Sequence, residues 1–365
     1  MKILEIEEFS AGIGGVSARV IQEAREFVKL GHSVTIFSSD IEEGTGNQAV
    51  SEESVSGIKI KRFPSQTGFL DRMLTKNVTY FNFQEELAKL NPNIVITHTI
   101  HPHSFKALSL CLKKNIPCFL VTHAPFNVKR KFPLNILTEI FNNLNKPKLR
   151  KFTKIISITK WENAYLKKLG IPEEKGVYIP NGIPSEFFSQ KKEKAKSKVL
   201  FLGRIAPVKN LEVFIQAAKM LPNIKFDIVG MAEQDYLTHL KGLVEKENIT
   251  NVSFFPPVFD LKEKIKVIDN HSIFILPSKR EAMPQSLIEA MARAKIVISS
   301  KTDGGKELVQ DGRTGFLFDS ADSLVDLVRK NISGNKKIEI EAEKFASQFN
   351  WNKLIKKYEQ LFQNL

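Results

Sequence analysis

The residues best suited to chemistry by type and spacing are two glutamates eight positions apart, Glu281 and Glu289. Glu281 lies in a polar loop after the apolar run 272–276, and Glu289 lies in a helix predicted to begin near Pro284, because proline suits a first helical turn. If the whole interval were helical, the carboxylates would be about 12 Å apart along the axis. That separation is too long for a shared metal ion or a carboxylate dyad, and it suits an extended ligand such as a sugar joined to a ribose. The alternative is a loop glutamate beside a solvated helical one.

Two cations, Arg204 and Lys209, occupy the loop between a predicted strand at 198–202 and a helix that begins near Asn210. In open α/β sheets, ligands bind beyond the carboxyl ends of the strands. A guanidinium and an ammonium at such an end can hold a diphosphate, and the amides of the following helix add dipolar attraction. The alternative is a pair of solvated cations among the 54 lysines and arginines of the chain.

A glycine-rich turn, Gly12-Ile-Gly14-Gly15, follows the first predicted strand and precedes a helix. Glycines let the backbone turn tightly and present amides to an anion, although the same pattern also serves a plain strand-to-helix turn. The turn is not a dinucleotide fingerprint of the dehydrogenase type, because the spacing G-x-G-x-x-G and the acidic residue about 20 positions further on are both absent.

Histidines gather where two predicted strands end. His98, His101 and His103 have a spacing that fits no tetrahedral metal motif, and neither cysteine nor acid joins them locally, so a ligand-lining role is favoured over metal binding. His123 closes the predicted strand 117–122. A histidine at a strand end can serve a ligand, or it can simply satisfy a loop carbonyl.

Length and composition limit the classes of protein. The 365 residues suffice for two domains of ordinary size, and 42% hydrophobic with 26% charged residues is typical of soluble globular proteins. No run of about 18 apolar residues predicts a membrane-spanning helix, and the acids in the first nine residues favour a first strand over a signal peptide. The two cysteines, Cys111 and Cys118, give neither a metal spacing nor a disulfide framework, which favours a reducing cytoplasm. A net charge of +14 predicts an anionic partner such as nucleotide, lipid head groups or nucleic acid.

Strand-like and helical patterns alternate along the whole chain, which predicts an α/β protein with parallel sheets covered on both faces. A charge-dense stretch at 190–198 has the character of a linker, so we place a boundary at about 185–197. The predicted strands are 2–7, 31–37, 57–63, 93–98, 117–122, 154–159 and 176–180 before this boundary, and 198–202, 224–229, 251–255, 272–276, 295–299 and 315–318 after it. Apolar residues at 351, 354/355, 358 and 361/362 predict an amphipathic terminal helix.

Four short motifs in this order resemble glycosyltransferase family 4: Ile179-Pro-Asn181-Gly182, Phe201-Leu-Gly203-Arg204 with Lys209-Asn210, Glu281-x7-Glu289, and Gly304-Gly305 with Asp311-Gly312. The resemblance covers nearly the whole chain. It implies the GT-B fold, with two Rossmann-like domains facing across a cleft. By this resemblance we expect an acceptor-side domain at 1–185, a donor-side domain at 197–345, and a terminal helix at 346–365 that crosses back to the first domain.

The resemblance also implies roles for individual residues. His123 would contact the donor sugar, Arg204 and Lys209 would neutralise the leaving nucleoside diphosphate, and Glu281 and Glu289 would bind the sugar and the ribose. His98 and His101 would line the acceptor side. One departure is Ala282, where many members have glycine. The expected donor-binding residues are Gly14, Gly15, Gly203, Gly230, Met283, Pro284, Gln285, Ser286 and Glu289.

The mechanism implied by this resemblance needs no metal and no cofactor. No D-x-D sequence is present to hold a metal-bridged diphosphate, so protein cations must stabilise the departing phosphate. No acid at a motif position is a convincing covalent nucleophile. We therefore expect a retaining transfer from a UDP- or GDP-sugar to a hydroxyl of a glycan or lipid-linked acceptor, through an oxocarbenium-like transition state. A nucleotide-sugar epimerase or phosphorylase of the same fold is the alternative.

Basic residues crowd the segment 128–160, where Glu139 is the sole acid, and apolar residues recur at helical spacing. Such a helix can lie on an anionic membrane surface, or it can be an ordinary core-facing helix with solvated cations. Because many family members act on lipid-linked acceptors, we expect a cytoplasmic protein with peripheral contact at the inner membrane face. Nucleic-acid binding is the rival interpretation of the charge, but no stacking aromatics interleave the basic run. The basic residues are Lys129, Arg130, Lys131, Lys146, Lys148, Arg150, Lys151, Lys154 and Lys160, and the apolar ones are Leu134, Leu137, Ile140, Phe141 and Leu144.

Overall fold

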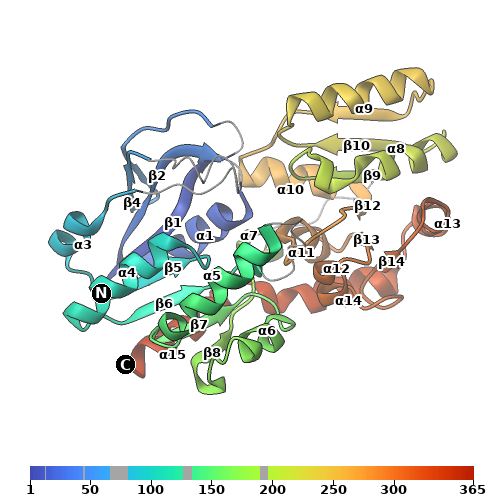
Figure 1. The fold of residues 1–365 in the computed structure, drawn as a ribbon. Coiled ribbons are helices and arrows are strands. Elements are labelled where there is room, and N and C mark those ends of the chain that lie inside the picture. Colours follow the sequence, from blue (N-terminus) through green and yellow to red (C-terminus); the bar gives the residue numbers. More distant parts are fainter. Residues whose placement is uncertain (13, 44–45, 66–80, 126–133, 190–195) are drawn as a thin grey trace. The chain divides into compact units, whose positions relative to one another are not determined.

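The computed structural model describes residues 1–12, 14–43, 46–65, 81–125, 134–189 and 196–365 (Figure 1), apart from several side chains between 134 and 142 and that of Lys196. The chain divides into two compact units. Met1–Pro180 and Leu354–Leu365 form the first unit, and Asn181–Lys353 form the second. Part of the predicted linker (190–195) and three of the predicted basic residues (Lys129, Arg130 and Lys131) lie outside the described residues.

In the first unit, the described strands form one sheet in the order β3-β4-β2-β1-β5-β6-β7-β8, which is parallel except for β3. Leu4 and Ile6 of β1 belong to a buried apolar cluster on one face of the sheet. Glu5 and Glu7 point to the other face, because side chains alternate along a strand. The bounds are β1 (Lys2–Gly12), β2 (Ser33–Glu43), β3 (Glu52–Val55), β4 (Ile58–Phe63), β5 (Ile94–His98), β6 (Cys118–Val121), β7 (Lys154–Ser157) and β8 (Gly176–Tyr178).

The C-terminal helix α15 (Trp351–Gln363) completes the first unit from Leu354 onward. The rings of Tyr358 and Phe362 lie 5.4 and 5.7 Å from the ring of Phe27, measured between centroids. This packing confirms the predicted amphipathic helix and its return to the first domain. The other helices of this unit are α1 (Gly15–Lys29), α3 (Gln84–Leu90), α4 (Pro102–Lys114), α5 (Leu134–Leu149), α6 (Glu162–Lys168) and η2 (Glu173–Lys175).

In the second unit, the described strands form a fully parallel sheet in the order β11-β10-β9-β12-β13-β14. The strands are β9 (Lys196–Leu202), β10 (Lys225–Val229), β11 (Val252–Phe255), β12 (His271–Leu276), β13 (Ile296–Ser300) and β14 (Phe316–Phe318). The helices are α7 (Glu186–Ser189), η3 (Pro207–Lys209), α8 (Leu211–Met220), α9 (Gln234–Lys246), α10 (Leu261–Asp269), α11 (Gln285–Ala292), α12 (Asp303–Leu308), α13 (Ala321–Asn331), α14 (Lys336–Ala346) and η4 (Ser347–Phe349).

Both sheets are doubly wound, with the order reversing between β1 and β5 in the first unit and between β9 and β12 in the second. At such a switch point the two connections leave toward opposite faces, and ligands bind beyond the carboxyl ends of the strands. Among the described strands, β3 is the one that the sequence did not predict, because its polar residues give no apolar run. None of the helices within the described ranges combines the length and apolarity needed to cross a membrane.

Candidate active site

The loops that follow β9 and β12 meet at the switch point of the second unit. Nζ of Lys209, at the end of η3, lies 2.6 Å from Oε1 of Glu281. The hydroxyl of Ser278 donates to the same oxygen at 2.6 Å. The predicted phosphate-binding lysine and the predicted sugar-binding glutamate thus form one ion pair, and only 20% and 12% of their side chains are exposed.

Two hydrogen bonds fix these two loops to each other. The amide of Lys279 donates to the carbonyl of Val208 at 2.9 Å, and Nδ2 of Asn210 donates to the carbonyl of Pro277 at 3.3 Å. Asn210 has a φ of 53° at the start of α8, a left-handed conformation in which asparagine is enriched. The geometry of the ion pair is therefore set by the backbone of both loops.

Arg204 lies in the same loop but is more exposed. Its guanidinium is 3.9 Å from the carboxylate of Glu233, and 37% of the arginine side chain is accessible. An exposed pair at this distance contributes little free energy, so the guanidinium can exchange it for a phosphate. Close backbone approach also shapes this end of the sheet, because a Cβ on Gly230 would lie 1.8 Å from the carbonyl oxygen of Gly203.

The loop that carries Glu281 is held from its other side by α12. The amide of Gly304 donates to the carbonyl of Glu281 at 3.0 Å, and a Cβ at position 304 would lie 2.7 Å from the carbonyl oxygen of Ala282. Glycine is needed there because the two backbones nearly touch. The Gly304-Gly305 motif therefore supports the loop of Glu281 through its backbone.

Helix α11 begins at Gln285 with Pro284 at its N-cap, which confirms the predicted start. Met283 is buried, and its carbonyl accepts a hydrogen bond from Nδ2 of Asn181 at 2.9 Å. Gln285 and Ser286 are half-buried in the first turn. The segment is thus tied to the Asn181-Gly182 motif within the second unit.

Glu289 lies inside α11 and is 1% exposed. Its Oε1 accepts a hydrogen bond from Nζ of Lys264 at 2.6 Å, whereas Oε2 has no hydrogen-bond partner among the described residues. An unsatisfied buried acceptor costs roughly 1–3 kcal/mol. A ligand hydroxyl that donates to Oε2 would recover part of that free energy, as the predicted ribose contact requires.

In the first unit, the glycine turn follows β1 at the switch point. Gly12 has a φ of 89°, and a Cβ there would lie 2.3 Å from the carbonyl oxygen of Glu43, so no other residue fits without a shift. Gly14 is the N-cap of α1, and Gly15 is its first residue. Residue 13 lies outside the described part of this turn. The turn therefore places a helix start directly beyond β1.

His123 follows β6 in a strained conformation. Both His123 and Ala124 have positive φ values, 55° and 54°, in the left-handed region that non-glycine residues rarely adopt. Buried Glu162, the first residue of α6, stabilises this turn. One of its oxygens accepts from the amide of Ala124 at 2.9 Å and from the hydroxyl of Thr122, and the other accepts from the amide of Ile158 at 2.8 Å.

The ring of His98, at the end of β5, lies beside that of His123. Nδ1 of His98 is 2.9 Å from Nε2 of His123, and Nε2 of His98 is 2.9 Å from Oε2 of Glu5. Burial lowers the pKa values of both histidines well below 6.5, so both rings are neutral at physiological pH. Both ring nitrogens of His98 are occupied inside the unit, which leaves neither for an acceptor molecule.

His101 and His103 are also neutral. Burial lowers the pKa of His101 to about 2 and that of His103 to about 4. Nε2 of His103 donates to the carbonyl of His98 at 3.0 Å, so this ring supports the end of β5. The predicted role of His101 at an acceptor remains a prediction, and its Nε2 lies 4.0 Å from Oε1 of Glu8.

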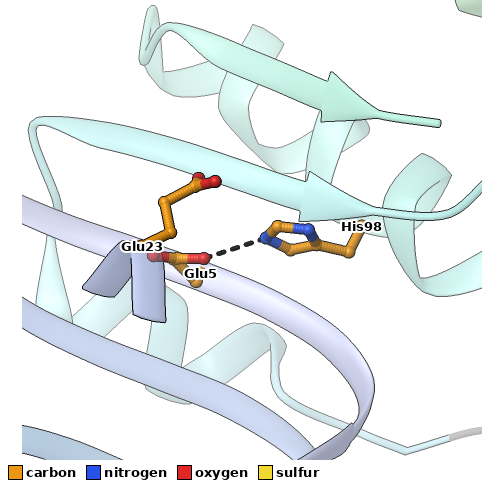
Figure 2. A group of neighbouring side chains, drawn as sticks. All are labelled: Glu5, Glu23 and His98. Atoms are coloured by element: carbon orange, nitrogen blue, oxygen red, sulfur yellow. Dashed lines mark hydrogen bonds and ion pairs between the residues drawn. The ribbon is translucent and has the colours of Figure 1, made fainter. Parts of the chain in front are cut away.

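Among the described residues, Glu5, Glu23 and His98 bring potential metal-ligand atoms within 4.8 Å of one another (Figure 2). A protein cation already pairs with one of these carboxylates, because Nε of Arg19 lies 3.1 Å from Oε2 of Glu23. Nε2 of His98 is engaged with Glu5, as the dashed line in Figure 2 shows. We therefore interpret the group as a buried hydrogen-bond and charge network rather than as a metal site.

Solved structures share this architecture. Sucrose-phosphate synthase from Thermosynechococcus elongatus superposes with a TM-score of 0.76 at 18% identity, covering 100% of this chain and 98% of that one. Anabaena Alr3699/HepE in complex with UDP-glucose gives 0.75 at 17% identity, covering 100% of both chains. The lipopolysaccharide glycosyltransferase WaaG gives 0.73 at 15% identity, covering 99% of both chains. These likenesses and the two doubly wound domains define a protein of the GT-B fold.

Sequence comparison gives the family. Residues 13–187 match the family model described as Glycosyltransferase Family 4, and residues 183–348 match Glycosyl transferases group 1. The chain therefore belongs to the group 1, family 4 type of glycosyltransferases.

Named relatives agree with this family. The glycosyltransferase MJ1069 of Methanocaldococcus jannaschii is 30% identical over 188 residues, 48% of this chain and 47% of the relative. The putative colanic acid biosynthesis glycosyltransferase WcaL of Escherichia coli is 28% identical over 171 residues, 43% and 42% of the two chains. The alignments thus span about half the length of these curated relatives.

Two functional candidates were missed from the sequence. Glu5 interrupts the apolar run of the first strand, and this interruption was a usable signal. Glu162 gave no signal, because a glutamate at a helix start is usually solvated. Its role in holding the turn is visible only in the structure, where four residues of two loops donate hydrogen bonds to its buried carboxylate. They are Thr122, Ala124, Ile158 and Thr159.

Proposed function

We propose that this protein is a retaining glycosyltransferase that moves a sugar from a UDP- or GDP-sugar to a hydroxyl of a glycan or lipid-linked acceptor, without a metal ion. The observation that carries the proposal is the Lys209–Glu281 ion pair at the carboxyl ends of β9 and β12, with Arg204 in the same loop as Lys209. Two cations and a carboxylate in these loops suit the position at which an α/β sheet binds its ligands.

In this mechanism the cations act on the leaving group. Arg204 and Lys209 stabilise the charge that develops on the diphosphate, a role that preorganised cations fill in phosphoryl sites. Glu281 accepts hydrogen bonds from sugar hydroxyls, and Glu289 accepts from the ribose. His123 contacts the reacting sugar, and the donor phosphate assists deprotonation of the acceptor. The product then keeps the anomeric configuration of the donor.

The names of similar proteins support these donor and acceptor classes. Solved structures of Alr3699/HepE contain UDP or UDP-glucose. A Campylobacter jejuni relative, 24% identical over 61% of this chain and 62% of its own length, is an N-acetylgalactosaminyltransferase acting on an undecaprenol-linked saccharide. The HepE structures are consistent with a UDP-sugar donor, and the name of the Campylobacter relative is consistent with a lipid-linked acceptor.

The surface of α5 supports peripheral membrane contact. Ile136, Ile140 and Leu144 recur every four residues, so they lie on one side of the helix, and 46%, 49% and 73% of their areas are exposed. Exposed Lys148 and Lys151 follow in the chain. An apolar stripe with nearby cations suits the interface of an anionic bilayer.

A thermal-shift screen of UDP-, GDP- and ADP-sugars tests the proposal. A ligand that binds only the native state raises the melting temperature. We expect one nucleotide class to stabilise the protein and Arg204→Ala to abolish that shift. Product analysis with the best donor should show retained anomeric configuration, and an inverted product would rule out the mechanism. No stabilisation by any nucleotide sugar would remove the donor assignment.

A further inference from the structure

A layer of charged side chains lies buried between β1 and α1 in the first unit. Glu5 and Glu7 of β1 and Arg19 and Glu23 of α1 all have 0% exposed area. Burying charge is costly unless the charge is paired or neutralised by a proton. Arg19 pairs with Glu23, and its Nη2 also donates to the hydroxyl of Tyr358 at 3.1 Å. Arg19 acts on Glu5 and Glu23, and Arg62 acts on Glu7, so two guanidinium groups serve three buried carboxylates and at least one acid needs a proton.

Glu5 begins a chain of hydrogen bonds that ends at His123. Its Oε2 contacts Nε2 of His98 at 2.9 Å, and Nδ1 of His98 contacts Nε2 of His123 at 2.9 Å. Oε1 of Glu5 has no hydrogen-bond partner among the described residues. Glu5 therefore acts on its surroundings chiefly through His98.

Two arrangements satisfy both bonds without leaving a buried donor unpaired, because each neutral imidazole carries one N–H and a proton on Oε1 of Glu5 would find no acceptor among the described residues. In the first, a protonated Glu5 donates to Nε2 of His98, whose Nδ1–H donates to Nε2 of His123, so His123 carries its proton on Nδ1. In the second, every bond reverses: Nε2–H of His123 donates to His98, whose Nε2–H donates to an ionised Glu5. The state of one buried carboxyl thus decides which nitrogen of His123 is protonated.

We propose that Glu5 is a positioning residue, which as a protonated acid holds the proton of His123 on Nδ1 through His98. This arrangement gives His123 a further property. When Nδ1 of His123 gives its proton to a basic oxygen of the bound ligand, the proton of His98 Nδ1 moves to Nε2 of His123, and the proton of Glu5 moves to Nε2 of His98. One proton leaves, both rings stay neutral, and the negative charge resides on Glu5. The catalytic consequence rests on the proposed contact of His123 with the reacting sugar.

The surroundings of Glu5 favour its protonated form. Burial raises the pKa of Glu5 well above its ordinary value, and the nearby carboxyls of Glu23 and Glu7 raise it further, while Arg19 opposes them. Burial also raises the pKa of Glu7 well above its ordinary value. Titratable groups from β1, α1, β5, α4, α15 and the loop after β6 pack around this chain of hydrogen bonds. They are Glu5, Glu7, Arg19, Glu23, His98, His103, His123 and Tyr358.

Nitrogen-resolved NMR of histidine-labelled protein tests the arrangement directly. At neutral pH we expect the wild-type His123 proton on Nδ1. Glu5→Gln keeps a donor to His98, so the proton should stay on Nδ1, whereas Glu5→Met should leave His123 a mixture of tautomers. Glu7→Gln is the matched control, because it changes a buried acid of the same strand that does not contact His98, and it should match the wild type. A wild-type proton on Nε2, or one tautomer in all four proteins, would overturn the proposal.

Kinetics then separate this proposal from the proposed function. We expect Glu5→Met to lower kcat about tenfold or more with the donor KM within about twofold, and Glu5→Gln to recover most of the loss. If the tautomers respond as expected and kcat does not change, the proposed catalytic effect of Glu5 is wrong. The donor assignment is tested independently, by donor binding in the thermal-shift screen. A stoichiometric metal ion in purified protein that is lost in Glu5→Gln would overturn the hydrogen-bond assignment itself.

Discussion

Lys209 and Glu281 are 72 positions apart in the chain, yet Nζ of the lysine lies 2.6 Å from Oε1 of the glutamate. The pair holds a cation and an anion at the carboxyl ends of β9 and β12, and each charge neutralises the other. A diphosphate can draw on the lysine, and a sugar hydroxyl can then donate to the glutamate. Under the proposed function, the ion pair couples binding at one end of the ligand to binding at the other.

Lys209→Met should lower kcat/KM for the nucleotide sugar by about 100-fold, because it removes a preorganised cation and leaves Glu281 without its partner. Steady-state kinetics with the donor found by the thermal screen would measure this. Lys219→Met is the matched control, since Lys219 forms an exposed ion pair with Glu247 in the same unit. Equal losses in both variants would contradict a specific role for Lys209.

Arg204→Ala should abolish detectable donor binding while the protein stays folded, because its one charged contact among the described residues is weak and exposed. Calorimetry of nucleotide binding and the melting temperature without ligand give the two readouts. The control is Arg313→Ala, which breaks an exposed pair with Glu341. Unchanged kinetics in Arg204→Ala would remove the diphosphate assignment.

Glu289→Gln should weaken nucleotide binding by about tenfold, because an amide replaces the buried carboxylate that, in the proposed function, accepts from the ribose. The comparison that isolates the ribose uses an analogue lacking both ribose hydroxyls. Wild type and variant should bind this analogue with the same affinity. A variant that discriminates between the two nucleotides as strongly as the wild type would place Glu289 away from the ribose.

Stability should fall in mild acid because of buried neutral histidines. The folded-state pKa of His103 is about 4, below its ordinary value of 6.5, so the unfolded chain takes up the proton first as the pH falls. Its stabilising contribution is complete above about pH 6.5 and is lost progressively toward pH 4, on the order of 3 kcal/mol. Urea unfolding at several pH values would show this slope. His103→Gln keeps a donor to His98 and should make the slope shallower by the share of His103, because His98, His101 and His123 still contribute, whereas His239→Gln, at an exposed histidine, should leave the slope unchanged.

The membrane contact of α5 makes a separate prediction. Wild-type protein should float with anionic liposomes at low salt, and Ile140→Ser with Leu144→Ser should abolish flotation, because the exposed apolar stripe supplies the buried area. Ile340→Ser in α14 is a control at another exposed isoleucine, and it should float like the wild type. Absence of wild-type flotation would end the membrane proposal and leave the donor chemistry untouched.

The sequence was informative wherever local pattern determines structure. Apolar runs such as 272–276 predicted the parallel strands, and Pro284 predicted the start of α11, since both depend on neighbouring residues alone. The order of short motifs predicted the family and therefore the GT-B fold. The strand β3 was missed, because an edge strand of polar residues carries no periodic apolar signal.

Contacts between distant segments were beyond prediction. The Lys209–Glu281 pair depends on how two loops leave neighbouring strands, and the side-chain types do not encode that distance. In the same way, His98 suggested a ligand-lining residue, yet its ring lies between Glu5 and His123. Burial converts residues that are ordinarily solvated into neutral or paired groups, and burial is a property of the folded chain.

The helix α15 has a consequence for biosynthesis. Tyr358 and Phe362 close the hydrophobic surface of Phe27, a residue translated more than 300 codons earlier. Until α15 has been synthesised, the surface of Phe27 and the guanidinium of Arg19 therefore remain incompletely covered. A nascent chain stalled before residue 354 should therefore recruit chaperones through its first domain, although every strand of that domain has already emerged.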